Sequence, residues 1–156
     1  MTASEEELYI RKIKEGTVID HITSGHALSV MRILGLTGKE NNVVSIAINV
    51  PSRQLGRKDI VKVEDKELSA DELDKIALIA PKATINIIRN FVVAEKQKVK
   101  LPKIIRGIVQ CDNPMCISNS REPIQTTFFL EVEDPLRLRC YYCNRIIDEE
   151  AMIRQF

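Results

Sequence analysis

The run Cys111-Asp-Asn-Pro-Met-Cys116, followed by Cys140-Tyr-Tyr-Cys143, decides how the second half of this chain folds. These are all 4 cysteines of the 156 residues. Two close pairs on two tight turns can present four thiolates at the corners of a tetrahedron, the geometry that Zn²⁺ accepts. Asn113 and Pro114 supply the turn chemistry of the first pair. The spacing therefore predicts one zinc ion bound by Cys111, Cys116, Cys140 and Cys143.

Two disulfides, or four unrelated buried thiols, are the ordinary alternative for these cysteines. Residues 1–15 are polar and acidic, without the basic flank and apolar run of a secretory signal. We therefore expect a cytoplasmic, reducing location, where disulfides are disfavoured. Four thiolates leave no open coordination position, so the predicted metal is structural. Its binding free energy, on the order of 10–16 kcal/mol in zinc-finger peptides, is enough to stabilise a segment with a small core.

The composition is that of a globular protein, with 44% hydrophobic and 29% charged residues. No apolar run approaches the roughly 18 residues that cross a bilayer, so we expect no membrane partner. The chain has 23 basic and 22 acidic residues, and neither half carries the positive excess that binding to a nucleic-acid backbone usually requires. A zinc-ribbon protein that binds nucleic acid is therefore the alternative function, and the 4% aromatic content weakens it.

The residues before the cysteines predict an α+β domain. One helix is expected after Ser24, with Ala27, Val30, Met31 and Leu34 on its apolar face, and a second begins at the capping box of Ser69 and Glu72. Strands are expected at 17–22, 43–50, 59–64, 83–88 and 91–99. This order is the βαββαβ ferredoxin-like sandwich, an antiparallel sheet with both helices on one face. The other face must then be solvated or paired with a second copy of the chain.

Pro102 marks the predicted boundary between a domain at 1–100 and a domain at 101–156. Short strands are expected around the cysteine turns, at 104–110, 126–132 and 136–140. The second domain is therefore predicted to be a small β domain of the zinc-ribbon type.

No catalytic constellation is visible, so we expect a protein that is not an enzyme. His21 follows Asp20, and adjacent strand residues point to opposite faces, which excludes the orienting pair that a general base needs. Composition alone makes His21 a structural strand residue. Lysines at 58, 62, 96 and 98 would hold a polyphosphate if their strands brought them together. They are otherwise ordinary solvated lysines.

Three runs, Gly16 to Ile22, Gly56 to Lys62 and Ala80 to Asn86, together with the spaced cysteines, resemble the regulatory chain of aspartate carbamoyltransferase. The resemblance covers nearly the whole length. It implies a non-catalytic subunit with a nucleotide-binding allosteric domain at 1–100 and a zinc domain at 101–156 that docks onto a catalytic chain. It also implies homodimers formed through the N-terminal sheets, and an assembly of two catalytic trimers with three regulatory dimers. CTP and UTP as inhibitors and ATP as activator would control pyrimidine biosynthesis through it.

The resemblance also implies roles for individual residues, and it replaces the structural interpretation of His21. Asp20 and His21 would lie beside the ribose and phosphates, Lys62 beside the sugar or base, and Lys96 on the triphosphate. Ile13, Asn86, Phe91 and Val93 match positions of the base pocket, where tyrosine often stands at position 91. Lys58 matches a position near a second nucleotide, with Mg²⁺ bridging the phosphates. Asn113 and Arg145 match positions that face the catalytic chain, where a lysine is usual at position 145.

Overall fold

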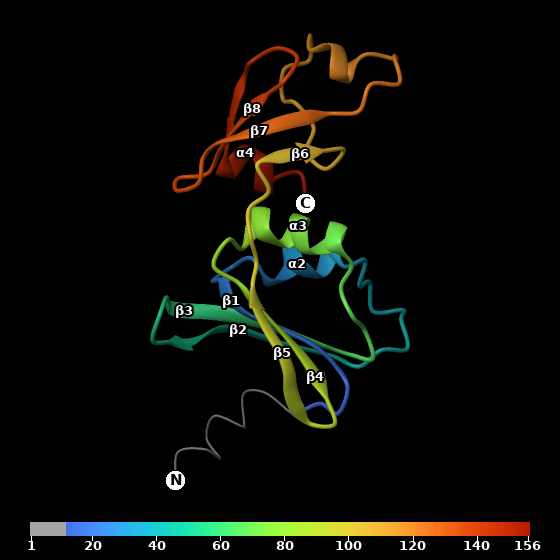
Figure 1. Cartoon of the computed structure of the whole chain (residues 1–156), viewed down its shortest axis with the longest axis vertical. Helices are drawn as coiled ribbons and strands as arrows, with labels where there is room; N and C mark the ends of the chain where they lie inside the picture. The colour runs from blue at the N-terminus through green and yellow to red at the C-terminus, as the bar shows by residue number, and fades with distance from the viewer. Residues whose placement is uncertain (1–11) are drawn as a thin grey trace. The chain divides into compact units, whose positions relative to one another are not determined.

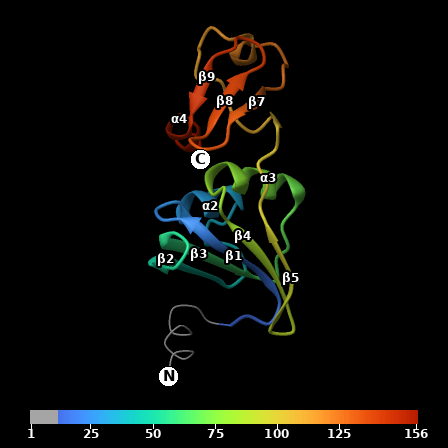
Figure 2. The ribbon, with the colours of Figure 1, turned by 60° about the vertical axis from the view of Figure 1, so that its left-hand side comes forward.

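The computed structural model describes residues 12–156, and the chain divides into two compact units, Met1–Lys100 and Leu101–Phe156 (Figures 1 and 2). In the first unit five strands form one antiparallel sheet, in the order β2-β3-β1-β4-β5. The first four have the order expected of a ferredoxin-like sheet, and β5 extends it at one edge. The strands are β1 (Gly16–Thr23), β2 (Val44–Ser52), β3 (Gly56–Glu64), β4 (Thr84–Arg89) and β5 (Val92–Lys98).

Two helices, α2 (Ala27–Ile33) and α3 (Ala70–Ile79), lie on the same side of this sheet (Figure 1). The predicted α+β fold with both helices on one face is therefore confirmed. The capping box of α3 is present, since the hydroxyl oxygen of Ser69 accepts from the backbone N–H of Glu72 and the Glu72 carboxylate accepts in return. The buried side of α3 includes Ile76 and Ala77.

Ser24, the serine before the expected helix and a candidate for its cap, does not cap α2. The residue at the N-cap is His26, and its side chain makes no capping hydrogen bond. The hydroxyl of Ser24 lies 3.2 Å from the side-chain oxygen of Asn49 instead. The backbone N–H of Ala27, in the first turn of α2, donates to a carboxylate of β3, that of Asp59. A residue distant in the sequence has taken the capping role.

A β-bulge corrects the expected alternation of β2. Strict alternation along this strand would place Val44, Ile46, Ile48 and Val50 on one face, but the register with β3 shifts between Ala47 and Val50. Asn49 lies in the left-handed region with φ 61°. Val50 is consequently buried, while Ile46 and Ile48 are 40% and 52% exposed.

The second unit is a small antiparallel sheet in the order β6-β7-β8-β9, as Figure 2 shows for its last three strands. One face of it is buried and holds Ile105, Phe128, Leu138 and Ile147. The cysteine pattern and β character were predicted, whereas β9 and the short helix after it were not. The elements are β6 (Ile104–Arg106), a 3₁₀ turn (Ile117–Asn119), β7 (Thr127–Val132), β8 (Arg137–Cys140), β9 (Ile146–Asp148) and α4 (Glu149–Ile153).

Candidate metal centre and anion-binding face

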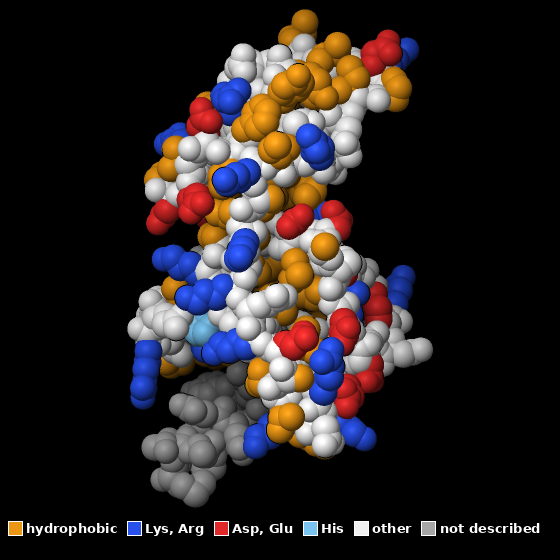
Figure 3. Space-filling model, viewed as in Figure 1, with side chains coloured by type: hydrophobic (Ala, Val, Ile, Leu, Met, Phe, Trp, Pro, Cys, Tyr) orange, Lys and Arg blue, Asp and Glu red, His pale blue; other side chains and the backbone are white. Residues whose placement is uncertain are grey.

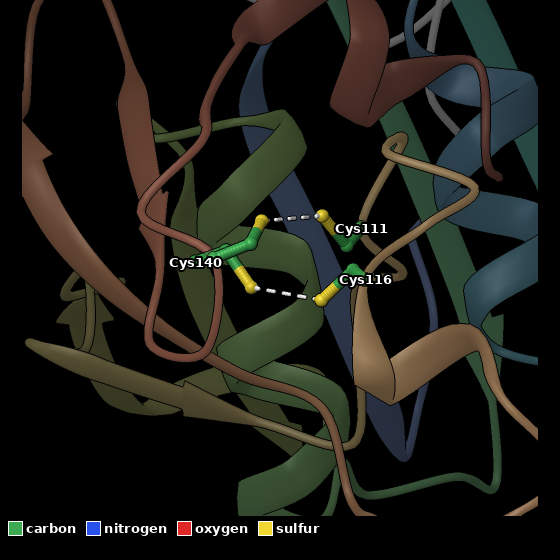
Figure 4. Close-up of side chains that lie close together, drawn as sticks. Cys111, Cys116 and Cys140 are labelled. Atoms are coloured by element: carbon green, nitrogen blue, oxygen red, sulfur yellow. Dashed lines mark hydrogen bonds between the residues drawn. The ribbon is translucent and has the colours of Figure 1, made fainter.

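The four cysteine sulfurs gather within 4.8 Å of one another. The sulfurs of Cys111 and Cys143 are 3.6 Å apart and those of Cys116 and Cys140 are 3.7 Å apart. A tetrahedron with metal–sulfur bonds of about 2.3 Å has edges of about 3.8 Å, so both separations fit a Cys₄ metal site. Figure 4 shows Cys111 and Cys116 reaching towards Cys140 from a separate stretch of chain. None of the four is in a disulfide.

Local hydrogen bonds hold the two cysteine turns in shape. The backbone N–H of Cys116 donates to the carbonyl of Asn113 at 3.0 Å, and that of Asn144 donates to the carbonyl of Cys140 at 2.9 Å. Asn144 has φ 63°, a left-handed conformation that asparagine tolerates. The side-chain amide of Asn119 closes the first turn by donating to the carbonyls of Cys111 and Asn113. The sulfurs are therefore presented by turns that are already formed.

The thiols differ in how readily they lose a proton. Burial raises the pKa of Cys111 to about 12 and also raises the pKa of Cys140. The backbone N–H of Arg145 lowers the pKa of Cys143 to about 7. Because a metal binds thiolates, its binding at this site must release protons from the buried pair.

Asn113 and Arg145 both lie on the metal-binding turns. The side-chain oxygen of Asn113 accepts from the backbone N–H of Met115 at 3.0 Å. The Nε atom of Arg145 lies 2.9 Å from a carboxylate oxygen of Asp112, and both of these side chains are partly exposed. The two residues that the resemblance assigned to a partner interface thus sit beside the metal centre, each with a partner inside its own unit.

The strand register places Lys58, Lys62, Lys96 and Lys98 on the sheet face opposite α2 and α3, which carries no helix of residues 12–156 and is called the uncovered face below. The Asp59 carboxylate points to the helix side, since it accepts from the backbone N–H of Ala27, so its neighbour Lys58 and likewise Lys62 lie on the other side. Cross-strand partners share a face of a sheet. A single row on the uncovered face therefore runs from Lys62 through Val18 and Asn86 to Lys96.

A second row lies beside the first, where Asp20 of β1 is opposite Thr84, and Thr84 is opposite Lys98. A lysine ammonium of β3, that of Lys58, lies 2.9 Å from the Asp20 carboxylate. The ring Nδ1 of His21 lies 3.1 Å from the hydroxyl of Thr84. The structure thus brings His21, Asp20 and three of the lysines together at one end of the face.

A bulge in β1 explains why His21 and Asp20 meet on the same side. The register with β3 shifts between Ile19 and Ile22, and His21 has φ 56°. The expectation that these neighbours point to opposite faces was therefore wrong, because strict alternation ends at the bulge. The two side chains still form no catalytic pair, since the Asp20 carboxylate accepts from the backbone N–H of His21 at 2.6 Å and the ring contacts Thr84.

The electrostatics of this region favour an anion. Burial lowers the pKa of His21, the charge of Asp20 raises it, and the lysines at 58, 96 and 98 lower it further. Burial also lowers the pKa of Lys62, against an opposing effect of Glu64. Lysine and arginine side chains surround a histidine on the viewed side of the first unit in Figure 3. A ligand with several negative charges would relieve this repulsion.

The other end of the uncovered face is apolar. Ile88 lies there, and it belongs to one buried cluster with Ile13, Val18, Val50 and Ile60. This cluster extends along the face, since Ile60 lies opposite Asp20 and His21, and Val50 lies opposite Lys58. The hairpin between β4 and β5 carries Phe91, which is 57% exposed with φ 66° and whose backbone N–H donates to the carbonyl of Lys14. Val93 is opposite Ile88 and is also exposed. Four residues of strand, about 13 Å, separate Thr84 from Ile88.

Sequence reasoning identified the lysines but missed Thr84 and Asp59. Thr84 is 3% exposed and joins two strands through its hydroxyl, yet as one threonine in a strand it carries no signal of its own. Asp59 is fully buried, and only the structure shows its three backbone donors. Within residues 12–156 no helix is long and apolar enough to cross a membrane.

These two units define a class of protein: a chain with an α+β domain and a separate small β domain whose four clustered cysteines can bind a structural metal. Residues 8–100 match the family model of the allosteric domain of the aspartate carbamoyltransferase regulatory chain. Residues 103–153 match the metal binding domain of the same chain. The protein therefore belongs to the aspartate carbamoyltransferase regulatory chain family, and it is a non-catalytic subunit.

Its relatives match over almost their whole length. The aspartate carbamoyltransferase regulatory chain of Korarchaeum cryptofilum is 54% identical over 152 residues, which are 97% of each chain. That of Thermofilum pendens is 54% identical over 152 residues, covering 97% of this chain and 96% of the relative. The regulatory chain of Pyrococcus horikoshii is 54% identical over 148 residues, covering 94% and 97%.

Proposed function

We propose that the uncovered face of the first unit binds effector nucleoside triphosphates, namely CTP, UTP and ATP. The observation that carries the proposal is the contrast between the two ends of this face, with a cluster of lysines around His21 at one end and the exposed apolar side chains of Phe91 and Val93 at the other. Phosphates would accept charge-assisted bonds from Lys96, with His21 beside them, and the Asp20 carboxylate would lie beside the ribose. The sugar would lie over Lys62 and Asn86.

The base would occupy the apolar end, against Ile13, Phe91 and Val93. Phe91 offers a ring without a hydroxyl, so backbone groups there would carry the choice between bases. Asn86 is half-buried in the same row as Lys62 and lies between the two ends of the face. Its amide can both donate to and accept from a nucleoside.

A second nucleotide, with Mg²⁺ bridging the two sets of phosphates, would lie next to Lys58. The ammonium of Lys58 is 2.9 Å from Asp20 in this structure. Contact with a second nucleotide would therefore replace, or extend, an existing ion pair. Its affinity should be the more sensitive of the two to salt, because Lys58 and Asp20 are partly exposed.

In the second unit we propose that the metal is zinc and that the surface beside it docks onto a catalytic chain of aspartate carbamoyltransferase. Asn113 and Arg145 would contribute polar contacts. Apolar side chains around the same turns are exposed, with Met115 at 88%, Ile117 at 51% and Tyr141 at 57%. An apolar patch with Arg and Tyr at its rim is typical of a protein interface.

We also propose that two copies pair through their N-terminal sheets, and that three such dimers join two catalytic trimers. The edge strand β2 supports pairing, because Ile46 and Ile48, with the neighbouring Val43 at 53% exposure, are unusually exposed for their type. The four unpaired cysteines support a reducing, cytoplasmic location.

In this assembly a nucleotide would control pyrimidine biosynthesis by binding two states with different affinity. An allosteric coupling is typically about 1–3 kcal/mol, so a few contacts decide its size and sign. The metal domain would carry the difference to the catalytic chain.

Calorimetric titration of CTP and ATP into the zinc-loaded chain tests the nucleotide site. The variant Lys96→Ala should weaken binding about tenfold or more, equivalent to roughly 1.4 kcal/mol. Lys75→Ala is the matched control, because Lys75 lies on α3 and pairs with Asp71. Equal affinities of the Lys96→Ala and unaltered chains would contradict the proposed face. Absence of binding by the unaltered chain would overturn nucleotide sensing by the isolated subunit.

A further inference from the structure

Two bulges lie side by side in the first sheet, on either side of β3. In β1, Asp20 and His21 together lie opposite Ile60, and in β2, Ile48 and Asn49 together lie opposite Asp59. Each bulge contains a left-handed residue, with φ 56° at His21 and 61° at Asn49. This conformation is uncommon outside glycine, although asparagine and histidine adopt it more readily than most residues, so neighbouring structure contributes to holding both residues in place.

The carboxylate of Asp59 holds both regions. One oxygen accepts from the backbone N–H of Asn49 at 2.8 Å, at the bulge of β2. The other accepts from the backbone N–H groups of Gly25 at 2.9 Å and Ala27 at 3.1 Å, in the turn that follows the bulge of β1. Asp59 is 0% exposed, and these three charge-assisted bonds compensate for burying its carboxylate. Ser24 and Asn49 add a side-chain contact between the same two regions.

The bulge of β1 is the feature that brings His21 to the lysine-rich end of the uncovered face, where we propose that the phosphates bind. This end is called the phosphate end below. Its extra residue is confined by the ladder at Ile19 on one side and at Ile22 on the other, where Ile22 pairs with Asp59 itself. The turn that the Asp59 carboxylate anchors follows directly after this strand. Asp59 also follows Lys58 directly in β3, so the same anchor fixes the backbone from which Lys58 reaches Asp20. The carboxylate acts from the helix side on the groups of the opposite face.

We propose that Asp59 is the positioning residue of the phosphate end, an inference that rests on the proposed nucleotide site. It touches no ligand. It sets the bulge that places Asp20 and His21 beside Lys58, and it thereby determines affinity for the polyphosphate without affecting the apolar end. A capping residue on α2 itself could replace Asp59 as the acceptor for the backbone N–H of Ala27. It would leave the backbone N–H of Asn49, in the bulge of β2, without its acceptor.

The test compares the two ends of the ligand in the full zinc-loaded chain. In Asp59→Asn the amide keeps one acceptor oxygen and opposes a backbone N–H with its own N–H groups. We expect binding of CTP, ATP and inorganic tripolyphosphate to weaken about tenfold or more, while binding of cytidine and adenosine, followed by NMR titration, changes less than about twofold. Asp71→Asn on the exposed start of α3 is the matched control and should change neither.

A second readout reports position directly. The sequence has 2 histidines, so the ring proton signals of His21 and His26 are separable by NMR. Asp59→Asn should shift the His21 signals and leave those of His26, whose Nδ1 lies 2.9 Å from the carbonyl of Ile79. A variant with unchanged His21 signals and unchanged tripolyphosphate affinity overturns the positioning role, as does equal weakening of nucleoside and tripolyphosphate.

A variant outside the core covers the case in which Asp59→Asn does not fold. Gly25 has φ +97° and open space around a β-carbon, so Gly25→Ala strains the anchored turn without a collision. It should weaken tripolyphosphate binding and spare nucleosides, and unchanged tripolyphosphate binding contradicts the inference. If the unaltered chain binds no nucleotide, the proposed function falls. If the unaltered chain binds and a folded Asp59→Asn chain binds equally well, only the positioning role falls.

Discussion

The ring Nδ1 of His21 lies 3.1 Å from the hydroxyl oxygen of Thr84, so the contact joins β1 and β4 at the lysine-rich end of the uncovered face. Chiefly because of burial, the pKa of His21 lies below its usual value of 6.5, with the lysines at 58, 96 and 98 acting in the same direction and Asp20 against it. His21 is therefore neutral at pH 7. A polyphosphate beside the ring would favour the charged form and raise the pKa.

The first prediction is that nucleotide binding takes up a proton near pH 6. Calorimetry of CTP binding in buffers with different ionisation enthalpies measures this uptake. The γ-phosphate titrates as well, so the relevant quantity is the difference between the unaltered chain and His21→Gln. His26→Gln is the control and should behave as the unaltered chain. Equal uptake by all three chains would exclude His21 as the proton acceptor.

In the chain without nucleotide, the lowered pKa of His21 makes the folded state less stable at acidic pH. The pKa of His21 is lower in the folded than in the unfolded chain, so His21 does not affect stability above about pH 6.5, where it is neutral in both. Below that pH the unfolded chain binds the proton more readily, and the free energy of unfolding therefore falls. Without nucleotide, the free energy of unfolding should fall between about pH 6.5 and 5 more in the unaltered chain than in His21→Gln. Urea titrations at each pH measure this difference.

The second prediction concerns Lys62, which is 8% exposed and whose pKa burial lowers from 10.5. Between the folded and unfolded pKa values the unfolded chain binds more protons, so stability rises with pH in that window and the charge costs stability at neutral pH. Lys62→Met should therefore stabilise the first unit by about 1 kcal/mol, which would raise its thermal midpoint by a few degrees. It should also weaken nucleotide binding. A lower midpoint, seen by calorimetry, would show that the charge is stabilising.

The third prediction is that metal removal destabilises the second unit and does not affect the stability of the first. A chelator should unfold the second unit, whose buried thiols lose the ion that holds them, and it should leave the first unit folded. Circular dichroism and metal release measure the loss, and CTP titration of the chelated chain measures what remains. Nucleotide binding that disappears together with the metal would refute this independence.

The fourth prediction concerns Gly16, which has φ +146° and whose β-carbon, if present, would collide with the carbonyl oxygen of Val63. The collision is with backbone, which cannot move aside within the ladder. Gly16→Ala should cost at least about 2 kcal/mol of stability. Gly38→Ala, at φ +88° with open space around it, is the control and should cost about 1 kcal/mol. Equal losses in urea unfolding would contradict a role of the collision.

The features that the sequence predicts are those coded locally. The capping box at Ser69 needs two side chains within one turn, and the cysteine pairs need only their spacing, so both are visible without a structure. The apolar periodicity of the helices follows the same rule, since Ala27 and Val30 are buried as expected.

The features that it does not predict depend on contacts between distant strands. The bulge at His21 is a shift in the register between β1 and β3, and Asp59 caps a helix 32 residues away in the sequence. An aspartate in an apolar run of β3 looks like an exposed strand residue until its donors are known. The role of Thr84 likewise depends on a distant strand, because its hydroxyl contacts the ring of His21 in β1.

The order of the metal ligands along the chain has a consequence for how the protein folds while it is being translated. Cys140 and Cys143 come after the last strand of the first unit, which ends at Lys98, and after most of the second unit, so the metal centre cannot close until the chain has been made as far as Cys143. The first unit has all of its strands by Lys98. During translation, domains fold as units from the N-terminal side. The nascent chain should therefore acquire its anion-binding face before it acquires its metal, and effector nucleotides would act as early folding ligands.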